Sequence, residues 1–305
     1  MFIKNTMKRK IVKQGAATMT ISLPASWIKK FNLKVGDELN IDEVGNKIEI
    51  STEKAMGEAK IVLDAEKLGF FTKNELGHLY FLGYDEVVIN FKNKEILAQI
   101  KDRLPDLIGY EIIDQTENKI TIKSISSGLE GEFDNILRKV FLLLKEMADN
   151  IYDALKNSQF QRLRQIREME GLNNRFTAFL NRIISKKGYK RPDRSLQAYD
   201  MIQNLERVAD EYKYICDDLA DRKTPVDKDV LELLSKINNY YKRLYEIFYK
   251  FDPKKKLVIY RERKSLKDKA AEFLKSEKET VLSAHLVSLL EKLYNTAGSY
   301  LALSI

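Results

Sequence analysis

Hydrophobic and polar residues change their spacing twice along this chain of 305 residues, and the three resulting stretches predict three kinds of structure. In the first stretch, β-branched and polar residues alternate over a few positions at a time, which is typical of short strands separated by turns. Strands are expected over residues 10–13, 18–23, 38–43 and 47–51, the last two joined as a hairpin by Gly45-Asn46. A single helical turn is expected over 26–30, with Ser26 as its cap.

The second stretch combines apolar strands with amphipathic helices. Strands are expected over 59–63, 86–91, 110–115 and 119–124, and helices over 72–82 and 94–104. The run at 86–91 is almost continuously apolar, which is typical of a strand buried within a sheet. This stretch therefore predicts a small α/β domain, and it contains no Gly-rich phosphate loop.

From residue 132 onward the apolar residues follow helical spacing. The first helix is the clearest, because apolar side chains recur at i, i+3, i+4 and i+7 from Leu137 to Leu155. Five further helices are expected over 159–186, 195–221, 228–251, 255–276 and 279–305. Together they predict two antiparallel three-helix units of similar length, residues 131–223 and 227–305, an arrangement typical of an internal duplication.

These patterns predict a multidomain α+β protein that is mainly α-helical, with domains at 1–53, 57–126 and 131–305. Residues 126–131 are the expected linker before the helices. The strands of the first domain are too few and too short to bury much apolar surface in one chain. Obligate dimerisation would solve that problem.

Charge changes the interpretation of the first domain. Residues 1–36 contain eight lysines and arginines and no carboxylate, although the chain as a whole has a net charge of only +8. Lys8, Arg9, Lys10 and Lys13 crowd beside Gly15. A stretch of one sign can neutralise phosphates and release their counterions, so a polyanionic partner is expected. A solvated basic tail is the alternative, but the strand-forming residues that follow favour a binding surface.

Cysteine usage and hydropathy restrict the location of the protein. Cys216 is the single cysteine, so no intramolecular disulfide can form and nothing indicates secretion. Residues 1–25 lack the apolar run of a signal peptide, and no apolar stretch is long enough to span a bilayer. We expect a cytoplasmic protein without membrane insertion.

The third predicted helix of the bundle, residues 195–221, offers the clearest candidate chemistry. Glu206 and Asp210 are four residues apart on it, so they project from one face, and Asp217 extends the stripe. Carboxylates on adjacent turns can hold a cation, although a solvated helix face is the alternative.

Other residues do not suggest catalysis. His78 and His285 have no spacing that indicates a shared metal site, and Cys216 lies on an apolar face where a small buried residue is expected. Tyrosines 240, 241, 245 and 249 recur at helical spacing, which favours packing over base stacking. We find no nucleophile–base pair and no nucleotide-binding fingerprint, so no enzymatic activity is expected.

Residues 7–52 resemble the AbrB/SpoVT family of swapped-hairpin DNA-binding domains. The resemblance rests on residues 9–13 (RKIVK), Gly15, Ser22-Leu23-Pro24, Trp27 and residues 33–37 (LKVGD). It implies a dimer in which two chains exchange hairpins to form one β-barrel. It also implies that basic residues near the first strands contact DNA, and the candidate contacts are Lys8, Arg9, Lys10, Lys13, Thr18 and Thr20.

Residues 132–305 resemble PhoU, the phosphate-uptake regulator, whose fold is a pair of three-helix bundles. Residues 205–210 (LERVAD) are similar to that family's metal-cluster motif. The resemblance implies Glu206, Asp210 and Glu170 as ligands of a divalent, iron or zinc-type metal. Two further motif positions, however, end in Asn174 and Asn295, and an amide is a poorer ligand, so these sites are expected to be partial or lost.

The three parts together resemble archaeal fused phosphate-uptake regulators. The leading hypothesis is a homodimeric DNA-binding transcriptional regulator of phosphate homeostasis, whose helical domain senses an effector or binds a partner. The alternative is an accessory protein that does not bind DNA and regulates a phosphate transporter or a signalling kinase by contact.

Overall fold

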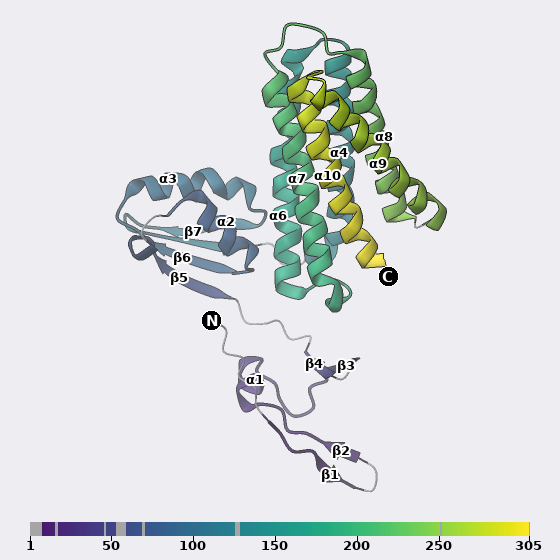
Figure 1. The fold of residues 1–305 in the computed structure, drawn as a ribbon. Coiled ribbons are helices and arrows are strands. Elements are labelled where there is room, and N and C mark those ends of the chain that lie inside the picture. The colour runs from purple at the N-terminus through teal and green to yellow at the C-terminus, as the bar shows by residue number, and fades with distance from the viewer. Residues whose placement is uncertain are drawn as a thin grey trace. The chain divides into compact units, whose positions relative to one another are not determined.

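The computed structural model describes residues 8–15, 18–45, 47–52, 59–68, 71–125, 129–250 and 252–304. The chain divides into two compact units, Met1–Ala59 and Lys60–Ile305. The larger unit contains a small α/β part and a bundle of long helices (Figure 1). The protein is thus a mainly helical multidomain chain with a small region of strands at its N-terminus, as the spacing of apolar residues predicts.

The first unit consists of two hairpins and one short helix. Strand β1 (Val12–Gln14) pairs antiparallel with β2 (Thr18–Thr20), and β3 (Asn40–Val44) pairs antiparallel with β4 (Lys47–Ser51). Within the described residues of one chain these are two separate two-stranded sheets, so the swapped barrel, which requires a second chain, stays a prediction. Helix α1 (Ala25–Lys30) begins after Pro24. The expected cap was wrong, because Ser26 lies inside the helix and no side chain caps it.

The α/β part contains a four-stranded sheet in the order β5-β6-β8-β7. Strand β5 (Lys60–Asp64) runs parallel to β6 (Glu86–Asn90), whereas β7 (Tyr110–Gln115) and β8 (Lys119–Ser124) complete it antiparallel. Helices α2 (Lys73–Phe81) and α3 (Lys94–Arg103) cover one face (Figure 1). Short 3₁₀ turns, η1 (Ala65–Leu68) and η2 (Leu104–Asp106), follow β5 and α3.

The first three-helix unit comprises α4 (Phe133–Lys156), a broken second helix and α7 (Ser195–Leu219). The prediction of one continuous helix over 159–186 was wrong. The segment consists of a 3₁₀ turn η4 (Phe160–Arg162), then α5 (Leu163–Arg167) and α6 (Met169–Lys187). At the break the Glu168 amide donates to the Gln165 carbonyl, a tighter bond than an α-helix makes. The break places Glu170 in the first turn of α6.

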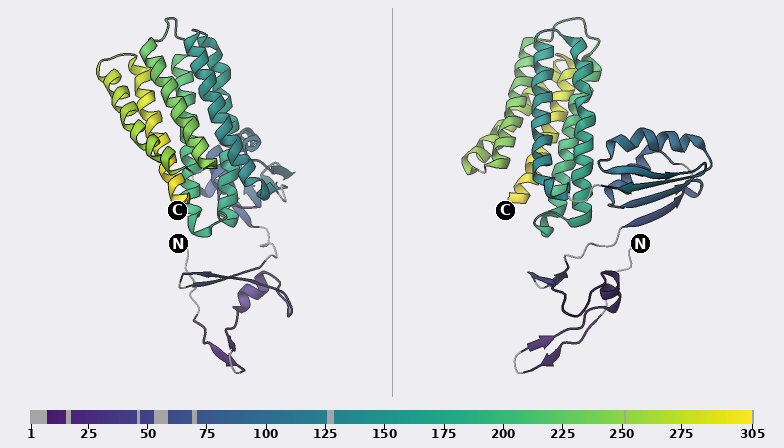
Figure 2. Two further views of the ribbon diagram at one scale, coloured as in Figure 1. Left: turned by 90° about the vertical axis from the view of Figure 1, so that its right-hand side faces the viewer. Right: turned by 180° about the vertical axis from the view of Figure 1, so that it is seen from behind.

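The second three-helix unit comprises α8 (Lys228–Tyr249), α9 (Pro253–Lys275) and α10 (Thr280–Ser304). Helix α10 packs along α7 and so joins the two three-helix units. Helix α9 contacts α8 and α10 on the outer side of the bundle (Figure 2). Among the described residues, no helix combines the length and the apolar character needed to cross a bilayer.

Arg182 of α6 fastens the α/β part to the helical bundle. Its guanidinium donates to the Tyr80 carbonyl oxygen and to Asp85 Oδ1, both at 2.9 Å, and lies over the rings of Tyr80 and Tyr110. The Arg182 side chain is almost completely buried, and Lys186 also pairs with Asp85. Because a buried guanidinium needs all of these partners, they define one preferred docking position for the α/β part.

Candidate functional site

The candidate DNA contacts lie on and before the first hairpin, and they do not form a single face. Lys8, Arg9 and Lys10 precede β1 and are exposed. Within the ladder Lys13 lies opposite Met19, whereas Thr18 and Thr20 lie opposite Gln14 and Val12. Since successive strand residues point to opposite faces, Lys13 is on the other face of the hairpin from the two threonines.

Apolar side chains of the first unit remain in solvent. Between residues 8 and 52, every side chain whose exposure the structure describes is exposed or half-buried. Ile11, Met19, Ile41 and Ile48 are each 64–71% exposed. Isolated two-stranded hairpins are at best marginally stable in water, and apolar surface of this kind is often covered by an interaction.

The candidate metal ligands meet at the contact between α6 and α7, where they surround a lysine. Lys213 Nζ donates to Glu170 Oε1 at 2.9 Å and to Asp210 Oδ1 at 2.6 Å. Burial lowers the pKa of Lys213, but the hydrogen bonds to the two carboxylates outweigh it and raise the pKa above its usual value. The lysine therefore remains charged, and its ammonium lies between two of the predicted ligands.

Glu206, the third predicted ligand, lies in the same polar cluster between α6 and α7. We call Glu170, Glu206, Asp210 and Lys213 the α6–α7 seam. Burial, followed by the negative charges of Asp210 and Glu170, raises the pKa of Glu206, against a hydrogen bond from Gln203. A carboxyl in this setting holds its proton more readily than one in water.

These residues do not fit the metal cluster that the PhoU resemblance implies. The described residues include no group of three histidine, cysteine or carboxylate side chains arranged to hold a metal ion. Asn174 Nδ2 donates to Glu170 Oε1 at 2.6 Å, so the amide also occupies that carboxylate. In the second three-helix unit, Glu291 of α10 pairs with Arg263 and Lys267 of α9. Glu170, Asp210 and Glu291 therefore each pair with a positively charged side chain.

A second polar cluster, which the sequence did not reveal, joins α7 to α10. Glu211 of α7 accepts hydrogen bonds from His285 Nδ1 and Ser288 Oγ, both at 2.7 Å, and from Lys292. Burial would raise the pKa of Glu211, but these three donors lower it to about 2.

His285 lies between two carboxylates in this cluster. Its Nε2 is 2.9 Å from Asp218 Oδ2. The hydrogen bond with Glu211 raises the pKa of His285, despite its partial burial. Both ring nitrogens then act as donors, as a protonated imidazole requires. His285, Ser288 and Lys292 share one face of α10 at i, i+3 and i+7, and this spacing is the signal that could have indicated the cluster.

Cys216 and the tyrosines of α8 have the structural roles that the sequence predicts. Cys216 is buried, and burial raises the pKa of its thiol to about 12, which removes it as a nucleophile. Tyr241 is buried and donates to the Phe141 carbonyl at 2.8 Å, while Tyr245 and Tyr249 contact the Phe141 ring. These tyrosines pack in the bundle, as their helical spacing predicts.

Comparison with known proteins gives matches to both ends of the chain. Residues 137–219, which extend from within α4 to the end of α7, match the family model of the PhoU domain. The first three-helix unit is PhoU-like. Residues 12–58 match a family model described as antidote-toxin recognition MazE, bacterial antitoxin. The chain therefore combines a MazE/AbrB-type match at its N-terminus with a PhoU-domain match in its helical part, and the two sequence resemblances are confirmed over these ranges. The resemblance of residues 220–305 to PhoU stays a prediction.

A solved structure also matches part of the chain. The crystal structure of the phosphate transport system regulatory protein PhoU from Streptococcus pneumoniae is 13% identical to this chain, with a TM-score of 0.48. The match covers 57% of this chain and 94% of that protein. No curated protein sequence matches the chain significantly.

Proposed function

We propose that this protein regulates phosphate uptake as a homodimer that binds DNA through its MazE/AbrB-type domain. The PhoU family match supports the phosphate connection. The observation that carries the dimer is the exposure of apolar side chains in the first unit, where every side chain of 8–52 whose exposure is described is exposed or half-buried. A second copy of the chain would cover Ile11, Met19 and the exposed β3–β4 residues, and the resemblance to swapped-hairpin domains supports this mode of pairing.

DNA binding is supported by charge. Lys8, Arg9 and Lys10 are exposed beside β1, in a region of 36 residues without a carboxylate. Dimerisation would place two such groups on one two-fold symmetric surface, so a palindromic or nearly palindromic operator is expected. The helical domain would act as the sensor or partner-binding module.

A binding assay with DNA from upstream of phosphate-transport genes tests this proposal. Replacing Lys8, Arg9 and Lys10 by alanine should abolish specific binding, because the variant lacks three cations per chain that neutralise phosphates. The salt dependence of log Kd should also fall, by about 0.9 for each phosphate that is no longer neutralised. The matched control replaces the exposed Lys139, Lys228 and Lys275 of the helical bundle by alanine. Equal DNA affinity of the Lys8/Arg9/Lys10 variant and the native protein would refute the proposed DNA-binding surface.

A second candidate function follows from the helical domain. The protein would regulate a phosphate transporter or a signalling kinase by direct contact, and the N-terminal domain would only form the dimer. A pull-down that recovers such a partner, together with no measurable DNA affinity at low salt, would favour this function. Specific DNA binding that the triple variant abolishes would exclude it.

A further inference from the structure

The first half of α9 is the most basic stretch of the helical bundle. Residues 253–267 contain seven lysines and arginines and one carboxylate, Glu262. That excess of six positive charges compares with a net charge of +8 for the whole chain of 305 residues. Arg243 pairs with Glu262, so this acidic group does not offset the exposed cations. Arg263 and Lys267 pair with Glu291 of α10, so the exposed cations that the structure describes in this stretch are Arg261 and Lys264.

Exposed apolar side chains accompany these cations on α9. Leu257, Val258 and Tyr260 are 50–64% exposed, whereas Ile259 between them is buried against the bundle. Arg261 and Lys264 are exposed on the same part of the helix. We call Leu257, Val258, Tyr260, Arg261 and Lys264 the α9 face. It lies on the outer helix of the bundle, which packs mainly against α8 and α10 (Figure 2).

The apolar surface continues inward from the α9 face. A groove of about 390 Å³ lies between α8, α9 and α10, and aromatic and aliphatic side chains line it, among them Leu257, Tyr260, Tyr240 and Tyr294. Leu257 and Tyr260 thus belong both to the exposed face and to the groove. The face is an apolar patch with cations beside it, rather than a uniformly polar surface.

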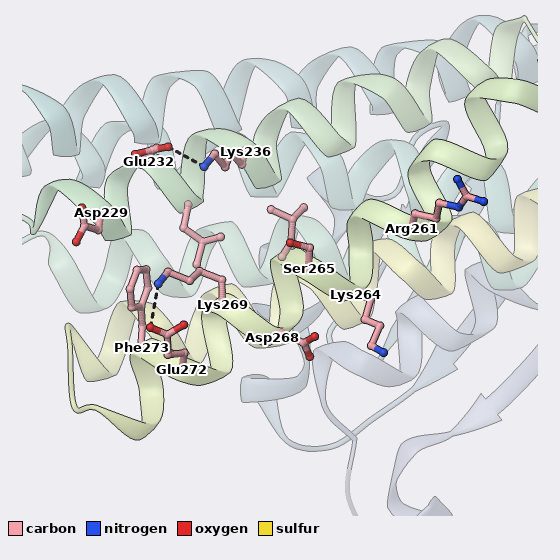
Figure 3. Close-up of a pocket in the computed structure, with 12 residues that line it drawn as sticks. Asp229, Glu232, Lys236, Arg261, Lys264, Ser265, Asp268, Lys269, Glu272 and Phe273 are labelled. Carbon is pink, nitrogen blue, oxygen red and sulfur yellow. Dashed lines mark hydrogen bonds and ion pairs between the residues drawn. The ribbon is translucent and has the colours of Figure 1, made fainter.

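The second half of α9 has a different character. A groove of about 830 Å³ between α8 and α9 extends from Arg261 and Lys264 of the α9 face into this half, and charges of both signs line it (Figure 3). Lys236 pairs with Glu232 at 2.6 Å and Lys269 with Glu272 at 2.9 Å. Arg261 lies at one end of this groove and Glu272 at the other (Figure 3). The excess positive charge therefore ends near Asp268, and the α9 face has a defined boundary.

We propose that the α9 face binds the surface of an anionic lipid bilayer. Basic side chains are attracted to anionic headgroups, and apolar side chains of an interfacial helix enter the boundary between headgroups and acyl chains. A nucleic acid would also attract Arg261 and Lys264, but it would leave Leu257 and Val258 in water. The combination of cations with exposed aliphatic side chains therefore favours a lipid surface over a phosphate backbone. The helix lies in the plane of this surface without crossing it.

Flotation of the full-length protein with lipid vesicles tests the proposal. The protein should float with vesicles of phosphatidylcholine mixed with phosphatidylglycerol and not with phosphatidylcholine alone. The charge variant R261E/K264E and the apolar variant L257S/V258S should each bind the anionic vesicles about tenfold or more weakly. The matched control K228E/K275E changes the same number of charges at exposed positions at the other end of the α8–α9 hairpin. It should bind like the native protein.

DNA affinity serves as the second measurement on the same proteins. Both α9 variants should retain the DNA affinity of the native protein and its helical circular dichroism, and the second of these shows that the bundle is folded. The proposal is overturned if the native protein does not float with anionic vesicles, or if the control loses binding as the α9 variants do. It is also overturned if the charge variant lowers DNA affinity while the apolar variant leaves vesicle binding unchanged, because the face would then bind nucleic acid.

Discussion

At the scale of single residues, Lys213 decides the chemistry of the α6–α7 seam. Two carboxylates, Glu170 and Asp210, share its ammonium, and Glu206 lies beside them. A lysine in this position supplies the positive charge that a metal ion would otherwise provide. Its three donors are directional and its charge is single, so it satisfies this seam without the ligand geometry that a metal demands.

Replacing Lys213 by methionine should leave the carboxylates of the seam without a cation. Because Lys213 and Glu170 are largely buried, we expect the free energy of unfolding to fall by about 2–4 kcal/mol. Mn²⁺ should then raise the melting temperature of the variant, since divalent cations bind carboxylate oxygens. Lys213→Arg, which keeps the charge, is the control, and calorimetry with and without Mn²⁺ is the measurement. Equal stabilisation of the native protein by Mn²⁺ would show that the metal site is intact.

The sequence predicted Glu206 and Asp210 as neighbours but not the lysine between the carboxylates. Asp210 and Lys213 are three residues apart on one helix, and local spacing can suggest that pair. Glu170 lies 43 residues away, and its approach to Lys213 depends on how α6 packs against α7. Glu211 was missed for the same reason, because its partners lie on α10, more than 70 residues further along.

At the scale of elements, the contact between α7 and α10 should depend on pH. Glu211 has a pKa of about 2 in the folded protein, against an ordinary value of 4.5. The stability that it contributes is present above pH 4.5 and is lost as the pH falls towards 2, and it amounts to about 3 kcal/mol. His285 behaves oppositely. Its pKa is raised, so its contribution is complete below pH 6.5 and is lost as the pH rises through the raised value.

Unfolding in urea across a range of pH would measure both effects. Glu211→Gln should make the decline between pH 4.5 and pH 2 smaller, to which Glu75, Asp227 and Glu291 also contribute, and His285→Gln should remove the decline on the alkaline side. His78 provides a control, because it lies on α2 in the α/β part, and His78→Gln should leave the alkaline decline in place. A native protein whose stability stays constant from neutral to alkaline pH would contradict the assignment of His285.

Periodicity predicted the elements well where packing follows a regular pattern. The apolar stripe from Leu137 to Leu155 gave α4, and the almost continuous apolar run gave β6. It failed at Glu168, because a change from α-helical to tighter hydrogen bonding leaves the spacing of apolar residues unchanged. The docking of the α/β part onto the bundle could not be predicted from the sequence either. In the sequence Arg182 is one basic residue among many, and its role depends on contacts with Tyr80, Asp85 and Tyr110 that form only in the folded chain.

At the scale of the whole molecule, the proposed dimer depends on apolar side chains of the first unit. Ile41 and Ile48 lie on one face of the β3–β4 hairpin and are both exposed in the single chain. Ile41→Asp/Ile48→Asp should make the protein monomeric in sedimentation experiments and abolish DNA binding, because charge on this face opposes its burial.

The matched control is Ile113→Asp/Leu196→Asp, which also places two carboxylates at exposed apolar positions, but in the second unit. It should sediment as the native protein does. If the Ile41/Ile48 variant remains dimeric, the first unit is not the site of dimerisation.

The exposed apolar side chains of the first unit, Ile11, Met19, Ile41 and Ile48, also affect how the protein would respond to its own abundance. Under the proposed dimer, completing the DNA-binding fold is a reaction between two chains, so at low abundance its yield rises with the square of chain concentration. Operator occupancy would then stay low while the gene is weakly expressed and increase steeply above a threshold. Repression or activation would be switch-like with respect to gene dosage, even without an effector.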